Sequence, residues 1–150
     1  MGSIEGVLVT PLKQIYHPKG DIYHAMKVSD QGYINFGEAY FSTIRTGEIK
    51  AWKRHHKMTL NLICPLGEIL FVLYDDRVGS PTRGVFQEIV LSTFCNYSRL
   101  TIPPGVWMGF KGIGPEINML LNIADIMHDP LEQENISVEK SHIIYNWIRK

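Results

Sequence analysis

The sequence predicts an all-β domain of the sandwich or barrel type. Short apolar or alternating runs recur about every 8 to 14 residues, with glycine and proline between them. No helical periodicity persists beyond about two turns. With 150 residues and 45% hydrophobic content, the chain is long enough to bury one core, so we expect a single domain over 1–150.

Each expected strand is an apolar or alternating run that a turn signal brings to an end. Proline fixes one backbone angle and glycine permits a reversal, so clusters of the two mark turns. Turns and loops are expected at 17–20, 30–36, 46–48, 65–67, 78–84 and 103–105. Strands are expected at 4–12, 22–28, 38–44, 50–57, 58–64, 70–74, 86–91, 98–102, 106–110 and 117–125. A single helical turn is expected at 130–134.

The stretch Lys50–Lys57 differs from ordinary core sequence because it places lysines, an arginine and two histidines around Trp52. Side chains of a strand alternate between its faces, so Lys53, His55 and Lys57 are expected on one side. A cationic face backed by apolar strands suggests an inner surface that receives an anionic ligand. The alternative is a solvated edge strand whose lysines deter pairing with another chain.

Composition excludes several classes of protein. With 15 basic and 15 acidic residues, the chain lacks the basic excess of a general nucleic-acid binder. No run reaches the roughly 18 to 20 apolar residues of a membrane span, and the N-terminus has no signal-peptide pattern, so we expect a cytoplasmic protein. Cys64 and Cys95 both lie in strand-like runs and are expected to be free, buried thiols rather than metal ligands.

Several turns and strand ends resemble the signature of the dTDP-4-dehydrorhamnose 3,5-epimerase family in order and separation. They are Tyr74–Arg77, Ser80–Gly84, Leu91–Ser92, Ile102–Gly105 and Gly109–Phe110, within a resemblance that runs from His17 to Trp147. The resemblance implies a cupin jelly roll, a double-stranded β-helix sandwich of two antiparallel sheets. It also implies a homodimer that acts on a nucleoside-diphosphate 4-keto-6-deoxyhexose without metal or organic cofactor.

The resemblance implies which residues bind the substrate. Cations replace the family's two diphosphate-binding arginines: Lys50 on the charged strand, and Lys19 in an N-terminal turn that reaches across the dimer. Ser42 matches a family serine. The remaining family positions on the neighbouring strands are occupied by different residues here, namely Glu38, Tyr40 and Met108.

The proton-handling positions of the family are also changed. Lys53 stands where the family has its histidine base, and His128 stands where it has its tyrosine acid. Burial among like charges can lower a lysine pKa towards neutrality, so Lys53 can act as a base and His128 as a donor. His55, on the same strand face as Lys53, is the alternative base. The segment also resembles the His-x-His-Lys run of the dTDP-sugar 3,4-ketoisomerases, with His55 as the second histidine.

Neighbouring residues have expected roles as well. Asp125 or Asp129 is expected to orient His128, and Asp75–Arg77 is expected to form a structural turn with ion pairing. Together the residues predict an epimerase or isomerase of a dTDP-linked keto sugar in deoxysugar or surface polysaccharide synthesis. The alternatives are a non-catalytic nucleotide-sugar-binding cupin and a metal-dependent cupin enzyme that uses His55 with His128 or His24.

Overall fold

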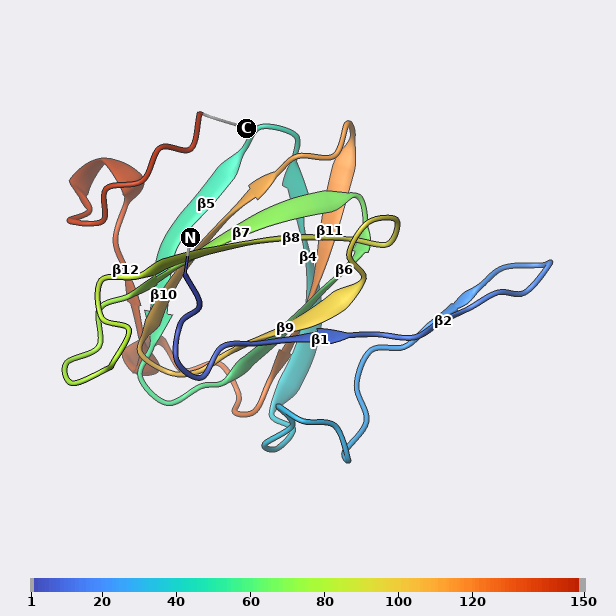
Figure 1. Cartoon of the computed structure of the whole chain (residues 1–150), viewed down its shortest axis with the longest axis horizontal. Helices are drawn as coiled ribbons and strands as arrows, with labels where there is room; N and C mark the ends of the chain where they lie inside the picture. Colours follow the sequence, from blue (N-terminus) through green and yellow to red (C-terminus); the bar gives the residue numbers. More distant parts are fainter. Residues whose placement is uncertain (1, 149–150) are drawn as a thin grey trace.

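A computed structural model describes residues 2–148 and confirms the all-β sandwich. Two five-stranded antiparallel sheets face each other, and a small two-stranded hairpin projects from one end (Figure 1). The first sheet has the order β1 (Leu8–Pro11), β9 (Ser98–Ile102), β6 (Leu60–Leu66), β11 (Ile117–Ala124), β4 (Glu38–Arg45). The second has the order β12 (Gln133–Asn135), β5 (Ile49–His55), β10 (Val106–Gly112), β7 (Glu68–Asp75), β8 (Phe86–Ser92). The hairpin pairs β2 (Gln14–Ile15) with β3 (Ile22–Tyr23).

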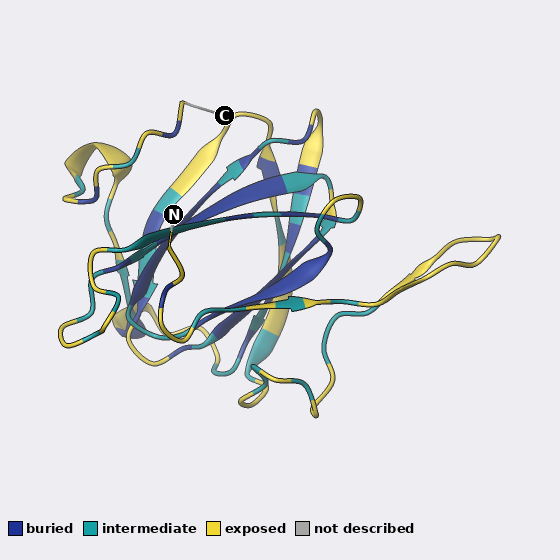
Figure 2. Ribbon diagram, viewed as in Figure 1, coloured by how far each residue is buried: buried dark blue, intermediate teal, exposed yellow. Residues whose placement is uncertain are grey.

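The main core lies between the two sheets and takes side chains from the inward faces of both. Leu62, Leu100 and Leu120 of the first sheet meet Phe71 and Leu73 of the second, all at 1% exposure or less. Because alternate residues of a strand point to opposite faces, each strand contributes every second side chain to this layer. The buried interior is visible along both sheets in Figure 2.

A second apolar cluster covers the outer face of the second sheet. Residues of the C-terminal segment, including Ile143 and Trp147, pack there against Trp52, Val72 and Trp107. β7 is therefore buried on both faces, which explains why its sequence is a nearly continuous apolar run rather than an alternating one.

The C-terminal segment also extends the second sheet beyond the charged strand. β12 pairs with β5, and the backbone of Ile136 exchanges two hydrogen bonds with that of Trp52, at 2.8 and 3.0 Å. β5 thus has neighbours on both sides, β12 and β10, so the interpretation of the lysine strand as a solvated edge is wrong.

Several predicted boundaries change. The strands expected at 4–12 and 22–28 shorten to β1 and β3, and the charged strand ends at His55, so Lys57 is exposed outside it. The helical turn is a 3-10 helix at Pro130–Glu132, and a second one at Val138–Lys140 was not predicted.

Cys64 is buried as predicted, but Cys95 is exposed because the chain leaves β8 before reaching it. No helix in the described part of the chain is long and apolar enough to span a bilayer.

The turn after β7 has the structural role that was predicted for it. The Asp75 carboxylate is fully buried and accepts hydrogen bonds from Arg77 at 2.9 Å and from the hydroxyls of Ser80 and Thr82 at 2.6 Å. Burial alone would raise the pKa of Asp75, but these donors outweigh burial and hold the pKa below its ordinary value.

We expect Asp75→Asn to lower the free energy of unfolding by about 3 kcal/mol, because it removes the buried charge that Arg77 and both hydroxyls share. Urea denaturation followed by tryptophan fluorescence measures the change. The control is Asp76→Asn, whose partly exposed carboxylate pairs with Arg83 and His142, and which should cost less than about 1 kcal/mol. Equal losses in the two variants would contradict this role for Asp75.

Candidate active site

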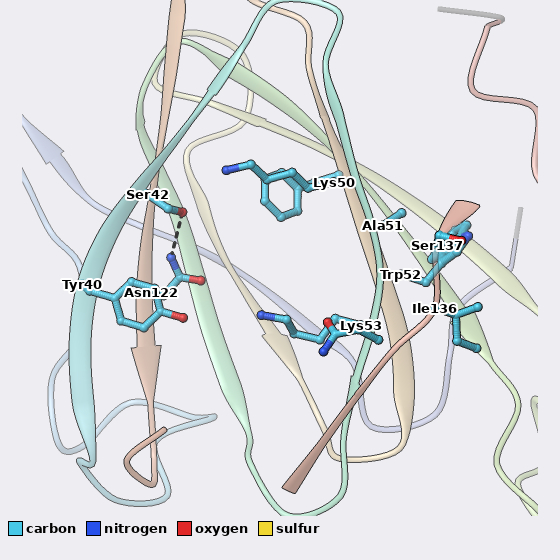
Figure 3. Close-up of a pocket in the computed structure, with 11 residues that line it drawn as sticks. Tyr40, Ser42, Lys50, Ala51, Trp52, Lys53, Asn122, Ile136 and Ser137 are labelled. Atoms are coloured by element: carbon cyan, nitrogen blue, oxygen red, sulfur yellow. Dashed lines mark hydrogen bonds between the residues drawn. The ribbon is translucent and has the colours of Figure 1, made fainter. Parts of the chain in front are cut away.

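A cavity of about 490 Å³ lies between the two sheets where β4 and β11 face β5 and β10 (Figure 3). The charged strand supplies one wall, the first sheet supplies the opposite wall, and the start of the C-terminal segment completes the rim. The lining residues are Tyr40, Ser42, Lys50, Ala51, Trp52, Lys53, Phe110, Asn122, Asn135, Ile136 and Ser137.

A β-bulge brings Lys50 and Lys53 to the same cavity. Strict alternation would place residues 50 and 53 on opposite faces of β5. In the pairing with β10, however, Lys50 stands opposite Phe110 and Lys53 opposite Met108, so one extra residue is inserted between them. The alternation predicted from the sequence therefore fails at the bulge, and both amino groups extend into the cavity (Figure 3).

Gly109 makes room for this bulge. A Cβ at position 109 would lie 2.6 Å from the Cβ of Ala51 and 3.0 Å from the ring of Trp147. A side chain there would push the bulge away from β10, so the position of the two lysines depends on this glycine.

The two lysines have different surroundings. Lys50 donates a hydrogen bond from Nζ to the carbonyl oxygen of Thr43 at 2.9 Å and lies 6.0 Å from the centre of the Phe110 ring. Lys53 is more enclosed. Burial, assisted by the positive charge of Lys50, lowers the pKa of Lys53, and the carboxylate of Glu132 opposes that shift.

The opposite wall is polar but uncharged at the cavity surface. Asn122 of β11 donates a hydrogen bond to the hydroxyl of Ser42 at 3.3 Å, and Tyr40 stands beside them on β4. Burial and the nearby carboxylate of Glu38 raise the pKa of Tyr40, so its phenol stays protonated at neutral pH.

A buried histidine and carboxylate pair stands next to Lys53 on the charged strand. Nδ1 of His55 lies 2.6 Å from Oε1 of Glu132, and the two residues are 8% and 5% exposed. The other carboxylate oxygen accepts hydrogen bonds from the backbone amides of Lys57 and Met58, both at 2.9 Å. The carboxylate therefore has a fixed position and holds the imidazole in one orientation.

The protonation of this pair suits a base. Burial lowers the pKa of His55, with smaller contributions from the charges of Lys53 and His128, although Glu132 opposes the change. Burial would raise the pKa of Glu132, but the amide of Lys57 and the imidazole outweigh it and the pKa is lowered. A neutral imidazole that donates Nδ1–H to an ionised carboxylate keeps the lone pair of Nε2 free to accept a proton.

The structure brings together only part of the predicted site. Tyr40, Ser42, Lys50 and Lys53 line the cavity, and the buried His55 adjoins Lys53 on β5. The other predicted residues lie outside the lining: Glu38 beside Tyr40, Met108 in the main core, His128 exposed near His55, and Lys19 exposed in the turn of the projecting hairpin.

The expected orientation of His128 by an aspartate is wrong. Asp125 accepts a hydrogen bond from the backbone amide of Thr59, and Asp129 caps the 3-10 helix through the amide of Leu131. The carboxylate that orients a histidine is Glu132, which the sequence analysis missed. Its only local signal is an acidic residue in a turn that begins with Asp-Pro, since the contact with His55 spans 77 positions.

The residues that a metal site would need are not grouped together. Across positions 2–148 no set of three or more histidine, cysteine, aspartate or glutamate side chains is placed to hold a metal ion. His24 lines a separate small cavity with Lys13 and Arg99.

Comparisons with known proteins give a consistent result, although no protein-family model matches the chain. It is 30% identical to a probable low-salt glycan biosynthesis epimerase, Agl13, of Haloferax volcanii, over 98% of this chain and 96% of that protein. It is 36% identical to a dTDP sugar isomerase from Desulfovibrio desulfuricans G20, whose crystal structure matches with a TM-score of 0.94 over 98% of this chain and 94% of that one. A dTDP-4-dehydrorhamnose 3,5-epimerase from Sulfolobus tokodaii shares the fold, with a TM-score of 0.83 at 23% identity over 97% of this chain and 83% of that one.

We expect Glu132→Gln to lower the pKa of His55 further, because Glu132 is the partner that raises it against the effect of burial. A titration of the imidazole resonances by NMR measures the change, and the neighbouring exposed His56 serves as an internal reference. A pKa for His55 that stays constant or rises in the variant would contradict the pairing.

Proposed function

Because this chain belongs to the cupin family of dTDP-sugar epimerases and isomerases, as the sequence resemblance predicted, we propose that it epimerises or isomerises a dTDP-linked 4-keto-6-deoxyhexose. The observation that carries the proposal is the buried His55–Glu132 pair beside a cavity that contains Lys50 and Lys53. Since the related epimerase from Haloferax volcanii belongs to glycan biosynthesis, we place this enzyme in deoxysugar supply for a surface polysaccharide or glycan. We expect it to work in the cytoplasm.

His55 is the proposed base. A C–H group beside a ketone is acidic, and a neutral imidazole held by a carboxylate is suited to remove its proton. The Glu132 carboxylate then stabilises the imidazolium that forms. Lys53, two residues away on the same strand face, is proposed to stabilise the negative charge that develops on the ketone oxygen. His128, which is exposed and whose charge acts on His55, is proposed to exchange that proton with solvent.

The cations near the cavity rim are proposed to bind the diphosphate. Lys50 extends into the cavity from β5 and supplies one charge. Lys19 lies on the projecting hairpin, so in a single chain it does not line the cavity, and we propose that a second copy contributes it. Exposed apolar side chains on the hairpin, among them Tyr16 and Ile22, suit burial in such a homodimer.

The remaining predicted contacts fall into two groups. Tyr40 and Ser42 line the cavity and are proposed to touch the sugar nucleotide directly. Glu38 and Met108 do not line it. They are proposed to act through neighbours, Glu38 through the charge it places near Tyr40 and Met108 through its pairing with Lys53.

Proton NMR in D₂O with dTDP-4-keto-6-deoxyglucose tests the function. We expect the enzyme to replace hydrogen by deuterium at C3 or C5, or to move the keto group, and we expect His55→Asn to slow this at least about 100-fold. The control is His56→Asn, because His56 is exposed and contacts Glu134 outside the cavity. Exchange at the unmodified rate in His55→Asn, with its fold intact by circular dichroism, would rule out His55 as the base.

Mixed dimers test the origin of Lys19. If a second copy supplies Lys19, each site of a dimer combines His55 of one copy with Lys19 of the other. In a dimer of one Lys19→Met copy and one His55→Asn copy, both changes then fall in one site and the other site is intact. A refolded 1:1 mixture of the two variants should then recover about a quarter of wild-type activity, because half of the dimers are mixed and each of these has one intact site. A mixture no more active than its separate components would mean that Lys19 does not act across a dimer.

A further inference from the structure

The two walls of the cavity lie on opposite sides of any sugar ring held between them. Lys53 lines the wall formed by β5 in the second sheet, and the buried His55 follows two residues later on the same strand. Tyr40, Ser42 and Asn122 line the wall formed by β4 and β11 in the first sheet. A base on the β5 side removes a proton from one face of the ring. Inversion at that carbon requires a donor on the other face, which is the side of the first sheet.

Among the described residues that line the first-sheet wall, Tyr40 has the only side chain with a suitable acidity. Ser42 and Asn122 bind each other, and a serine hydroxyl or an amide does not release a proton in the range that proteins use. A tyrosine hydroxyl, with an ordinary pKa of about 10, does. The raised pKa of Tyr40 keeps it in the acid form at neutral pH.

The position of Tyr40 suits the same role. Its hydroxyl points into the cavity, towards the side from which the amino group of Lys53 extends (Figure 3). The two side chains start from strands in different sheets, so a substrate that separates them has one on each face.

His128, which occupies the family's acid position, does not fit this requirement. It is exposed, and it lies near enough to His55 for its charge to lower the pKa of that residue. Unlike Tyr40, the other candidate for the acid, it does not line the cavity. The donor position on the first-sheet wall is therefore occupied by Tyr40 and not by His128.

We propose that Tyr40 is the catalytic acid and that the enzyme inverts a carbon next to the ketone, an inference that rests on the proposed function. Nε2 of His55 takes the proton of the C–H bond, and the electron pair moves to the ketone oxygen as an enolate. The Tyr40 hydroxyl then gives its proton to the same carbon from the opposite face as the ketone re-forms. The imidazolium returns its proton to solvent, and the phenolate takes one from solvent.

The test compares the wild type and Tyr40→Phe with dTDP-4-keto-6-deoxyglucose in D₂O, with deuterium incorporation and configuration at each carbon read by NMR. Phenylalanine retains the ring, so a role in stacking or packing survives the change and KM should stay within about threefold. We expect the wild type to incorporate deuterium with inversion. The variant should still incorporate deuterium through His55 with retention, while inversion slows by about 10² to 10⁴-fold.

Three outcomes would overturn the assignment, and they are distinguishable. Inversion by Tyr40→Phe at close to the wild-type rate would remove Tyr40 as the acid but leave the proposed function intact. Deuterium incorporation without inversion in the wild type would also remove Tyr40 as the acid and leave the proposed function intact. It would indicate movement of the keto group, or removal and return of the proton on one face of the ring. No incorporation and no keto-group movement in the wild type would overturn the proposed function, and the assignment of Tyr40 with it.

Discussion

A buried carboxylate has to be paired or hydrogen-bonded, and the way in which Glu132 meets this requirement organises the site. Its two oxygens bind the imidazole of His55 and the backbone amides that follow the charged strand. The contact joins the 3-10 helix before β12 to the end of β5, so one interaction fixes both His55, the proposed base, and the start of the C-terminal segment. That segment then continues along β5 and forms the rim of the cavity.

The charged strand serves two surfaces because of its bulge. Trp52 points outward into the aromatic cluster beneath the C-terminal segment, while Lys50 and Lys53 on either side of it point inward. Arg54, the next outward residue, lies 4.5 Å from the Trp107 ring and pairs with Glu134. The outward residues therefore hold β5 between β10 and β12, and the inward ones are free to meet a ligand.

Much of the fold could be predicted from local patterns, whereas most of the site could not. The strand at 98–102 follows from its alternating residues, and the two strands around 65–67 follow from continuous apolar runs with turn residues between them. All of these signals lie within a few positions of each other. β12 was missed because Gln133–Asn135 is polar and becomes a strand only when β5 offers it an edge. The bulge was missed because it depends on Gly109 in another strand, which periodicity along β5 cannot reveal.

The same difference between local patterns and contacts of distant residues explains which candidate site residues could be predicted. Family resemblance indicated which strand holds the cations and that His55 was a candidate base. It did not indicate Glu132, whose carboxylate supports His55 from 77 positions away in the sequence. His128 was the expected acid because of its place in the sequence, but it is exposed and does not line the cavity, whereas Tyr40 lines the wall opposite β5. Which side of the cavity a residue occupies depends on how the two sheets face each other.

The central claim is that the cavity holds a sugar between a base on β5 and the wall formed by β4 and β11, with the diphosphate at the lysines of the rim. A crystal structure of the protein with dTDP or a dTDP-sugar tests this most directly. The account predicts phosphate oxygens within hydrogen-bond distance of Lys50 and of a Lys19 from a second copy, with the sugar between His55 and Tyr40. A nucleotide bound outside this cavity, or a sugar that contacts neither side chain, would contradict it.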